Sequence, residues 1–224
     1  MFIVIEGLDG AGKSTQVRRV QQWLTDHGYE WEYLHFPRFA TPYYGEMIAR
    51  FLRGELGAVS SVDPYVVAML YAGDRRDAAS LIQGWIDQKK VVIVDRYVLS
   101  NIAYQCAKIE NTELRARLKE WITGLEYDYN AIARPDLELF LDVPFRFTAR
   151  KLSEQRAGDD RQYLNGKSDI HEASLDLQEA VRAIYIEHRA EHYHIIDCAD
   201  SQNGQMLPIE TISDKIINEI KAVL

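Results

Sequence analysis

The chain has 224 residues and a mass of 25.8 kDa, with 47% hydrophobic and 27% charged residues. This length and composition predict one globular domain over residues 1–224 and exclude collagen-like, low-complexity and disordered chains. The 34 acidic residues outnumber the 26 basic ones, which gives a net charge of −8. Because nucleic-acid binding depends on a surplus of basic residues, we expect no nucleic-acid partner.

The sequence also favours a cytoplasmic location. The chain begins with a short apolar run that lacks a basic leader, and no later stretch approaches the length of a membrane span. Its two cysteines, Cys106 and Cys198, have no Cys-x-x-Cys spacing and are expected to be buried thiols in a reducing compartment. We therefore expect no membrane partner.

Strand-like and helix-like segments alternate along the chain. The predicted strands are short apolar runs at residues 2–6, 31–36, 91–94, 137–142 and 193–197. The predicted helices are residues 13–27, 43–52, 64–88, 111–122, 145–153, 169–189 and 208–223. This order predicts an α/β fold of three layers, in which helices flank a five-stranded parallel sheet.

One polar, glycine-containing segment at residues 154–168 has no apolar run. A solvated connector and a functional lid explain its composition equally well. The chemistry of the rest of the chain has to decide between them.

The strongest motif is a phosphate loop, Gly-x-x-x-x-Gly-Lys-Ser, directly after the first strand and at the start of a helix. Its glycines let backbone N–H groups surround phosphate oxygens at a helix N-terminus. Lys13 is expected to reach the β- and γ-phosphates of a bound nucleotide, and Ser14 to hold Mg²⁺. The predicted nucleotide-binding residues of this loop are Gly7, Leu8, Asp9, Gly10, Ala11, Gly12, Lys13, Ser14 and Thr15.

A second polar group, Asp95-Arg96-Tyr97, follows the strand predicted at residues 91–94. Ligands of open parallel sheets bind beyond the carboxyl ends of the strands, so this group is expected beside the phosphate loop. Asp95 would act on the magnesium shell and Arg96 would bind a second phosphate. The alternative is a structural ion pair between the two at a strand end.

Several further motifs follow the phosphate loop in a specific order. They are Phe36-Pro-Arg38, Tyr71-Ala-Gly-Asp-Arg75, the block Asp95-Arg96-Tyr97-Val-Leu-Ser100-Asn101-Ile-Ala-Tyr104-Gln105, and Asp169-Ile-His171-Glu172. Together with the phosphate loop, they resemble the thymidylate kinase family over nearly the whole chain. The resemblance implies a P-loop NTPase-type fold, usually a homodimer, that transfers the γ-phosphoryl group of ATP to thymidine monophosphate (dTMP) with Mg²⁺.

The resemblance also implies roles for individual residues. Tyr71 stacks on thymine, Arg75 bonds its exocyclic oxygen, and Asn101 faces the base edge. Tyr104 occupies the space of a 2′-hydroxyl. The implied substrate-binding residues are Asp9, Phe36, Arg38, Tyr71, Arg75, Arg96, Ser100, Asn101, Tyr104, Gln105 and His171, and the implied metal ligands are Ser14, Asp95 and Glu172.

Members of the family differ in where a catalytic arginine lies, and the phosphate loop of this chain contains none. The charge is then expected from a short mobile lid at about residues 154–168, with Arg156 and Arg161 as the candidates. Arg150 is expected to stack on adenine, and residues 200–206 to form the second wall of the adenine site. The predicted catalytic residues are Lys13, Asp9, Arg96, Arg156 and Arg161.

Each assignment has a structural alternative. Tyr71 and Tyr104 are also compatible with core aromatic residues, and Asp169 with Glu172 has the spacing of a helix capping box. At the level of function, the alternatives are a P-loop kinase for another deoxynucleotide or a deoxynucleoside, and a nucleotide-binding regulator without turnover.

Overall fold

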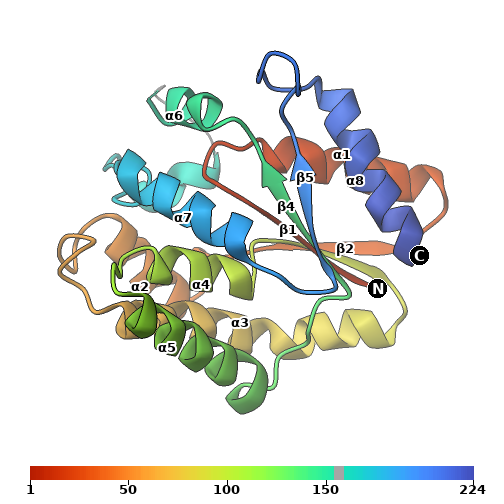
Figure 1. The fold of residues 1–224 in the computed structure, drawn as a ribbon. Coiled ribbons are helices and arrows are strands. Elements are labelled where there is room, and N and C mark those ends of the chain that lie inside the picture. The colour runs from red at the N-terminus through yellow and green to blue at the C-terminus, as the bar shows by residue number, and fades with distance from the viewer. Residues whose placement is uncertain (154–158) are drawn as a thin grey trace.

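The computed structural model describes residues 1–153 and 159–224, which form a parallel sheet between two layers of helices (Figure 1). The described strands are β1 (Phe2–Gly7), β2 (Trp31–His35), β3 (Val91–Asp95), β4 (Leu137–Asp142) and β5 (Tyr193–Asp197). They form one five-stranded sheet in the order β2-β3-β1-β4-β5, and every neighbouring pair is parallel. The predicted five-stranded parallel sheet is confirmed.

Helices connect the strands and cover both faces of the sheet. Their bounds are α1 (Lys13–Asp26), α2 (Tyr44–Leu52), α3 (Pro64–Asp87), α4 (Val98–Cys106), α5 (Thr112–Thr123), α6 (Phe145–Ser153), α7 (Leu175–Glu187) and α8 (Ile209–Val223), with a π-helical turn η1 (Gly124–Tyr129) and a 3₁₀ turn η2 (Asp159–Leu164). No helix in the described ranges is long and apolar enough to cross a membrane.

Alternating side chains of the strands build two separate cores. In β1, Phe2 and Val4 belong to a core shared with α3, α4, α5 and α7, whereas Ile3 and Ile5 pack with α1 and α8. Figure 1 shows α1 and α8 together on one side of the sheet and α3, α4, α5 and α7 on the other. Burial on both faces explains why the strands are uniformly apolar in sequence.

The sequence patterns did not predict α4. Every residue from Val98 to Cys106 is buried, so this helix has no alternation of polar and apolar faces that a helical period would reveal. Its N-terminus is held by the buried Glu6 carboxylate of β1, which accepts hydrogen bonds from the backbone N–H groups of Tyr97 (2.8 Å) and Ser100 (3.1 Å). A carboxylate at this position satisfies helix donors and favours the helix dipole.

The helix predicted at residues 169–189 starts later than expected. Ser174 is the N-cap of α7, and its hydroxyl accepts a hydrogen bond from the Leu177 N–H (3.3 Å). Asp169 instead closes a turn, because its Oδ1 accepts from the N–H groups of His171 (2.7 Å) and Glu172 (3.3 Å). Asp169 thus accepts from the Glu172 N–H, as in a capping box, but the pair lies before the Ser174 N-cap and does not cap α7.

Candidate active site

The loop after β1 has the backbone of a phosphate-binding loop. Gly10 and Gly12 have φ angles of 77° and 83°, in the left-handed region that favours glycine. Gly12 is the N-cap of α1, so the loop leads directly into a helix N-terminus, where unpaired N–H groups attract phosphate oxygens. The Lys13 Nζ at the start of α1 donates to the carbonyl oxygens of Gly7 (3.3 Å) and Leu8 (3.2 Å). Lys13 thus lies across the loop.

The end of β3 lies beside this loop because β1 and β3 are paired. Lys13 Nζ lies 3.9 Å from Asp95 Oδ1, and His35 Nδ1 lies 3.3 Å from Asp95 Oδ2. Burial alone would raise the pKa of Asp95, but Lys13 and His35 bring this pKa below its ordinary value. Asp95 is therefore a buried, charged carboxylate next to the phosphate site.

Arg96 links β3 to the phosphate loop and to α4. Its Nη2 donates to Asp9 Oδ1 (2.6 Å), and its Nη1 donates to Ser100 Oγ (3.2 Å). Burial would raise the pKa of Asp9, whereas Arg96 and Lys13 lower it below its ordinary value, so that Asp9 is ionised. The predicted proximity of Asp95-Arg96 to the phosphate loop is confirmed.

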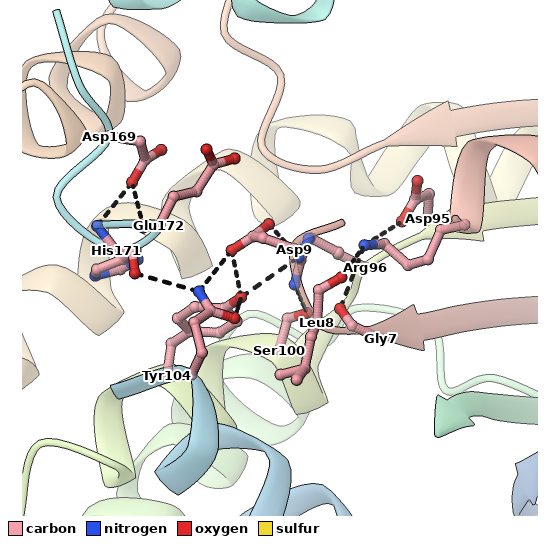
Figure 2. Close-up of polar contacts among 12 residues, drawn as sticks. Gly7, Leu8, Asp9, Asp95, Arg96, Ser100, Tyr104, Asp169, His171 and Glu172 are labelled. Atoms are coloured by element: carbon pink, nitrogen blue, oxygen red, sulfur yellow. Dashed lines mark hydrogen bonds and ion pairs between the residues drawn. The ribbon is translucent and has the colours of Figure 1, made fainter. Parts of the chain in front are cut away.

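Asp9 is also bonded from the other side of the site (Figure 2). Tyr104 Oη donates to Asp9 Oδ2 at 2.6 Å, and Gln178 Nε2 donates to the same oxygen at 3.0 Å. The Tyr104 ring stacks on His171, with a centroid distance of 5.1 Å. Burial and the positive charge of Lys108 lower the pKa of His171, so its ring is neutral. Gln178 belongs to α7 and was not predicted as a site residue.

One cavity of about 720 Å³ joins these groups to a second set of side chains. It extends from the loop residues Gly10–Thr15 past Asp95 and Arg96 to aromatic and polar residues of α3 and α4, a size typical of small-molecule sites. Of the residues predicted to bind substrate, those that line it are Asp9, Phe36, Tyr71, Arg75, Arg96, Ser100, Asn101, Tyr104, Gln105 and His171.

Arg38 is placed differently from its neighbours Phe36, Pro37 and Phe39, which line the cavity. The Arg38 guanidinium donates to Asp74 Oδ1 through Nε (2.9 Å) and to Asp77 Oδ2 through Nη2 (2.7 Å), both on α3. Two carboxylates of α3 thus hold the Arg38 guanidinium, and Arg38 is not among the residues that line the cavity. Phosphate contact by Arg38 stays a prediction.

Ser100 has mainly internal partners. Its hydroxyl donates to Glu6 Oε2 (2.5 Å) and lies 2.8 Å from the Tyr185 hydroxyl, in addition to accepting from Arg96. Ser100 therefore connects Arg96 to the buried Glu6 carboxylate that holds the N-terminus of α4. Its geometry favours a role in positioning Arg96.

A buried carboxylate that no sequence motif indicated contacts Arg75 and Asn101. Glu126 of η1 is completely buried, and its oxygens accept hydrogen bonds from Arg75 (Nε, 3.0 Å) and from Asn101 (Nδ2, 3.0 Å). One sequence signal was present, because Leu118, Ile122 and Glu126 are spaced by four residues along one buried face. A carboxylate in an apolar stripe requires a buried partner.

The end of the cavity opposite Arg75 and Asn101 contains some of the residues predicted for the adenine site. Met206 lines it, as expected for the wall formed by residues 200–206, together with Phe147 and Lys151 of α6. Arg150 is exposed, and its guanidinium lies 5.6 Å from the centre of the Phe147 ring. Phe147 and Lys151 therefore form the α6 side of the wall.

The lid expectation falls partly on residues outside the described ranges. Arg156 lies among residues 154–158, and the side chain of Arg161 is likewise outside what the structure describes. Farther along, Tyr163 lines the cavity, and its ring stacks on Phe39 with a centroid distance of 3.7 Å. Its hydroxyl donates to Asp169 Oδ2 (2.7 Å). Tyr163, near the end of the predicted lid segment, thus forms part of the cavity wall.

Two of the predicted magnesium ligands, Ser14 and Asp95, line the cavity at the phosphate loop. Asp95 Oδ1 is buried without a hydrogen-bond partner in the described part of the chain, and Ser14 lines the same cavity. An oxygen-only donor set of this kind suits Mg²⁺, which keeps several waters and shares ligands with nucleotide phosphates. Figure 2 shows Glu172 on the other side of Asp9 from Asp95. Within the described residues, no three His, Cys, Asp or Glu side chains form a metal site.

The fold and this cavity define a P-loop nucleotide-binding protein of the phosphotransferase type. A family model for thymidylate kinase matches residues 5–206. The thymidylate kinase of Mycobacterium tuberculosis is 34% identical over 188 residues, which cover 84% of this chain and 85% of that protein. A probable thymidylate kinase of Thermococcus kodakarensis is 31% identical over 230 residues, covering 100% of this chain and 98% of its own length. The chain belongs to the thymidylate kinase family.

The fold is also shared with a solved thymidylate kinase from Candida albicans. That structure superposes with a TM-score of 0.72 over 99% of this chain and 91% of its own, at 24% sequence identity. The predicted P-loop NTPase-type architecture is confirmed.

Proposed function

We propose that the protein transfers the γ-phosphoryl group of ATP to dTMP, giving dTDP and ADP. The observation that supports this most strongly is the single cavity that joins the phosphate loop to Tyr71, Arg75 and Asn101. Arg96 and Lys13 contribute positive charge between its two ends. Donor and acceptor phosphates bound at the two ends would meet where these cations lie, which is what phosphoryl transfer requires.

The chain's own residues would position and neutralise the reacting groups. Lys13 donates to carbonyl oxygens of the phosphate loop, so its ammonium group is already held next to the proposed phosphate site. Asp9 and Ser100 fix the guanidinium of Arg96, and the donors of this arginine that they do not use would bind the acceptor phosphate. A preorganised charge stabilises the transferring phosphoryl group more than a mobile one does.

Mg²⁺ is the proposed cofactor, with Ser14 and Asp95 as the residues that would hold it next to the phosphate loop. When bound, the ion would neutralise charge on the phosphates of ATP. Glu172, at the Asp9 side of the cavity, is proposed to act near the sugar and the metal. Inhibition by a chelator that added Mg²⁺ reverses would support this assignment.

We also propose a homodimer in the cytoplasm. The homodimer follows from the family resemblance, and α3 exposes the apolar side chains of Val66, Met69 and Leu81. The cytoplasm contains ATP, and both cysteines of the chain are free and buried. Analytical ultracentrifugation at several concentrations tests the dimer.

The deciding experiment is a coupled assay of ADP release with dTMP, dUMP, dCMP, dAMP and thymidine as acceptors. The proposed function predicts that dTMP has the highest kcat/KM. A higher value for another deoxynucleotide or for the nucleoside would replace the proposed substrate. Binding of ATP and dTMP without ADP release would instead support a nucleotide-binding regulator.

A further inference from the structure

We propose that Glu126 is a positioning residue that sets which hydrogen-bonding pattern the cavity presents to the base of the acceptor nucleotide. This inference rests on the proposed function, because it concerns how the dTMP site distinguishes thymine from cytosine. It is argued from a buried cluster of three side chains, Glu126 of η1, Arg75 of α3 and Asn101 of α4.

The cluster is almost completely buried. Glu126 is 0% exposed, and Arg75 and Asn101 are each 2% exposed. The Glu126 carboxylate accepts from Arg75 through both Nε and Nη2, and Oε1 accepts from Asn101 Nδ2. Removing one member would leave the others as buried, unpaired polar groups, which is costly. The three side chains therefore hold one another in these positions.

The orientation of the Asn101 amide follows from its partners. Its Nδ2 donates to Glu126 Oε1 (3.0 Å) and to the carbonyl oxygen of Ala68 (3.0 Å). Both partners are acceptors only, so the NH₂ group must face them, and its two hydrogens are then used. The remaining polar atom of the Asn101 side chain is Oδ1. Gln105 Nε2 lies 3.4 Å from this oxygen, which has a second lone pair.

Arg75 and Asn101 then offer opposite hydrogen-bonding characters. Both residues line the cavity. Arg75 has only donors, and its guanidinium is held by Glu126 and lies 5.9 Å from the centre of the Phe36 ring and 6.0 Å from the centre of the Tyr97 ring. Asn101 offers an acceptor. The cavity thus presents one donor and one acceptor to a base edge.

This pair matches thymine and mismatches cytosine. Thymine offers the O4 acceptor and the N3–H donor, whereas cytosine has an amino donor at position 4 and an acceptor at N3. Sites that hydrogen-bond a substrate reject an analogue that leaves their buried groups unpaired. Uracil has the same edge as thymine, so this cluster would not distinguish dTMP from dUMP.

A glutamine at position 126 would disturb this pattern without a large change in shape. Its amide NH₂ would face a donor of Arg75 or of Asn101. The Asn101 amide would then gain by rotating, which would turn its NH₂ toward the cavity at the cost of the bond to Ala68. Discrimination against cytosine is expected to weaken rather than to reverse.

The test measures kcat and KM for dTMP, dUMP and dCMP in the wild type, Glu126→Gln and Glu126→Asp, with Glu120→Gln on the exposed face of α5 as the matched control. We expect Glu126→Gln to reduce the dTMP-to-dCMP ratio of kcat/KM at least tenfold, mainly through KM for dTMP. The KM for ATP and the dTMP-to-dUMP ratio are expected to stay unchanged, and Glu120→Gln is expected to match the wild type.

Circular dichroism establishes whether each variant is folded. If Glu126→Gln does not fold, Glu126→Asp decides. Its shorter charged side chain can reach only one of the two partners, Arg75 or Asn101, so it should reduce the dTMP-to-dCMP ratio of kcat/KM at least threefold. An unchanged dTMP-to-dCMP ratio in a folded variant overturns the inference, and so does an equal loss for both nucleotides. Wild-type turnover of dTMP tests the proposed function separately.

Discussion

Tyr104 and Asp9 join α4 to the phosphate loop through a hydrogen bond of 2.6 Å between the phenol and the carboxylate. The same Asp9 carboxylate accepts from Arg96, so Tyr104 in the wall of the cavity and the Arg96 guanidinium share one anchor. The Tyr104 ring stacks on His171, whereas its hydroxyl bonds Asp9. Substitutions at Tyr104 should therefore separate the effect of the ring from that of the hydroxyl.

Tyr104→Ala is expected to weaken the preference for dTMP over its ribonucleotide analogue by about 5- to 100-fold, because the ring on His171 fills space that a 2′-hydroxyl would need. Tyr104→Phe keeps the ring and serves as the matched control. It should retain the preference while lowering kcat/KM, because Asp9 loses a donor. Steady-state kinetics on both nucleotides measures this. An unchanged deoxy-to-ribo ratio in Tyr104→Ala would rule out the ring as a sugar gate.

Lys13→Ala is expected to lower kcat by at least about a thousandfold while leaving the fold intact, since this charge acts on the transferring phosphoryl group. Its internal partners are backbone carbonyl oxygens and Asp95, and the exposed Lys119→Ala serves as a control for loss of a lysine elsewhere. ADP release measures kcat, and thermal unfolding shows whether the fold is intact. A folded variant with comparable turnover would contradict the role of the phosphate loop.

The predicted lid arginines call for kinetics on Arg156→Ala, Arg161→Ala and the double variant. Because the phosphate loop has no arginine, at least the double variant is expected to lose about a thousandfold in kcat with little change in KM. The double variant is needed because one arginine could replace the other. If the segment is only a polar connector, none of the three will change kcat by more than a few fold.

Lys108→Met is expected to stabilise the protein in a pH-dependent way. Burial lowers the pKa of Lys108 from 10.5 to about 7, so the charged form is disfavoured in the folded state. At or below pH 7 this cost is fully present, and it disappears as the pH rises from about 7 to 10.5, where the folded protein is deprotonated and the unfolded chain is not. The variant should gain about 1–3 kcal/mol at pH 6, after loss of the hydrogen bond to Gln105.

Urea unfolding at pH 6, 7.5 and 9 measures this effect, with the exposed Lys119→Met as the control. The advantage of Lys108→Met over the wild type should shrink as the pH rises. An advantage that is constant across this range would show that packing, and not the charge, limits stability at this position.

Local patterns in the sequence determined the sheet, most helices and the phosphate loop. The loop is predictable because its glycines, lysine and serine must occur at fixed spacing between a strand and a helix. Asp95 and Arg96 were predictable for a related reason, since parallel strands bring their carboxyl ends to one edge. Helix α4 was not, because complete burial removes the amphipathic pattern by which a helix is recognised.

Only the tertiary structure decided which side chains hold the predicted site residues in place. Glu126 and Gln178 are 25 or more residues from the partners that they bond, Asn101 and Asp9, so no local spacing connects them. The same holds for Arg38, whose carboxylate partners on α3 are known only once the helix is packed against the loop. Motif chemistry is local in sequence, whereas the pairing of buried charges depends on long-range packing, because each buried charge must find a partner in space.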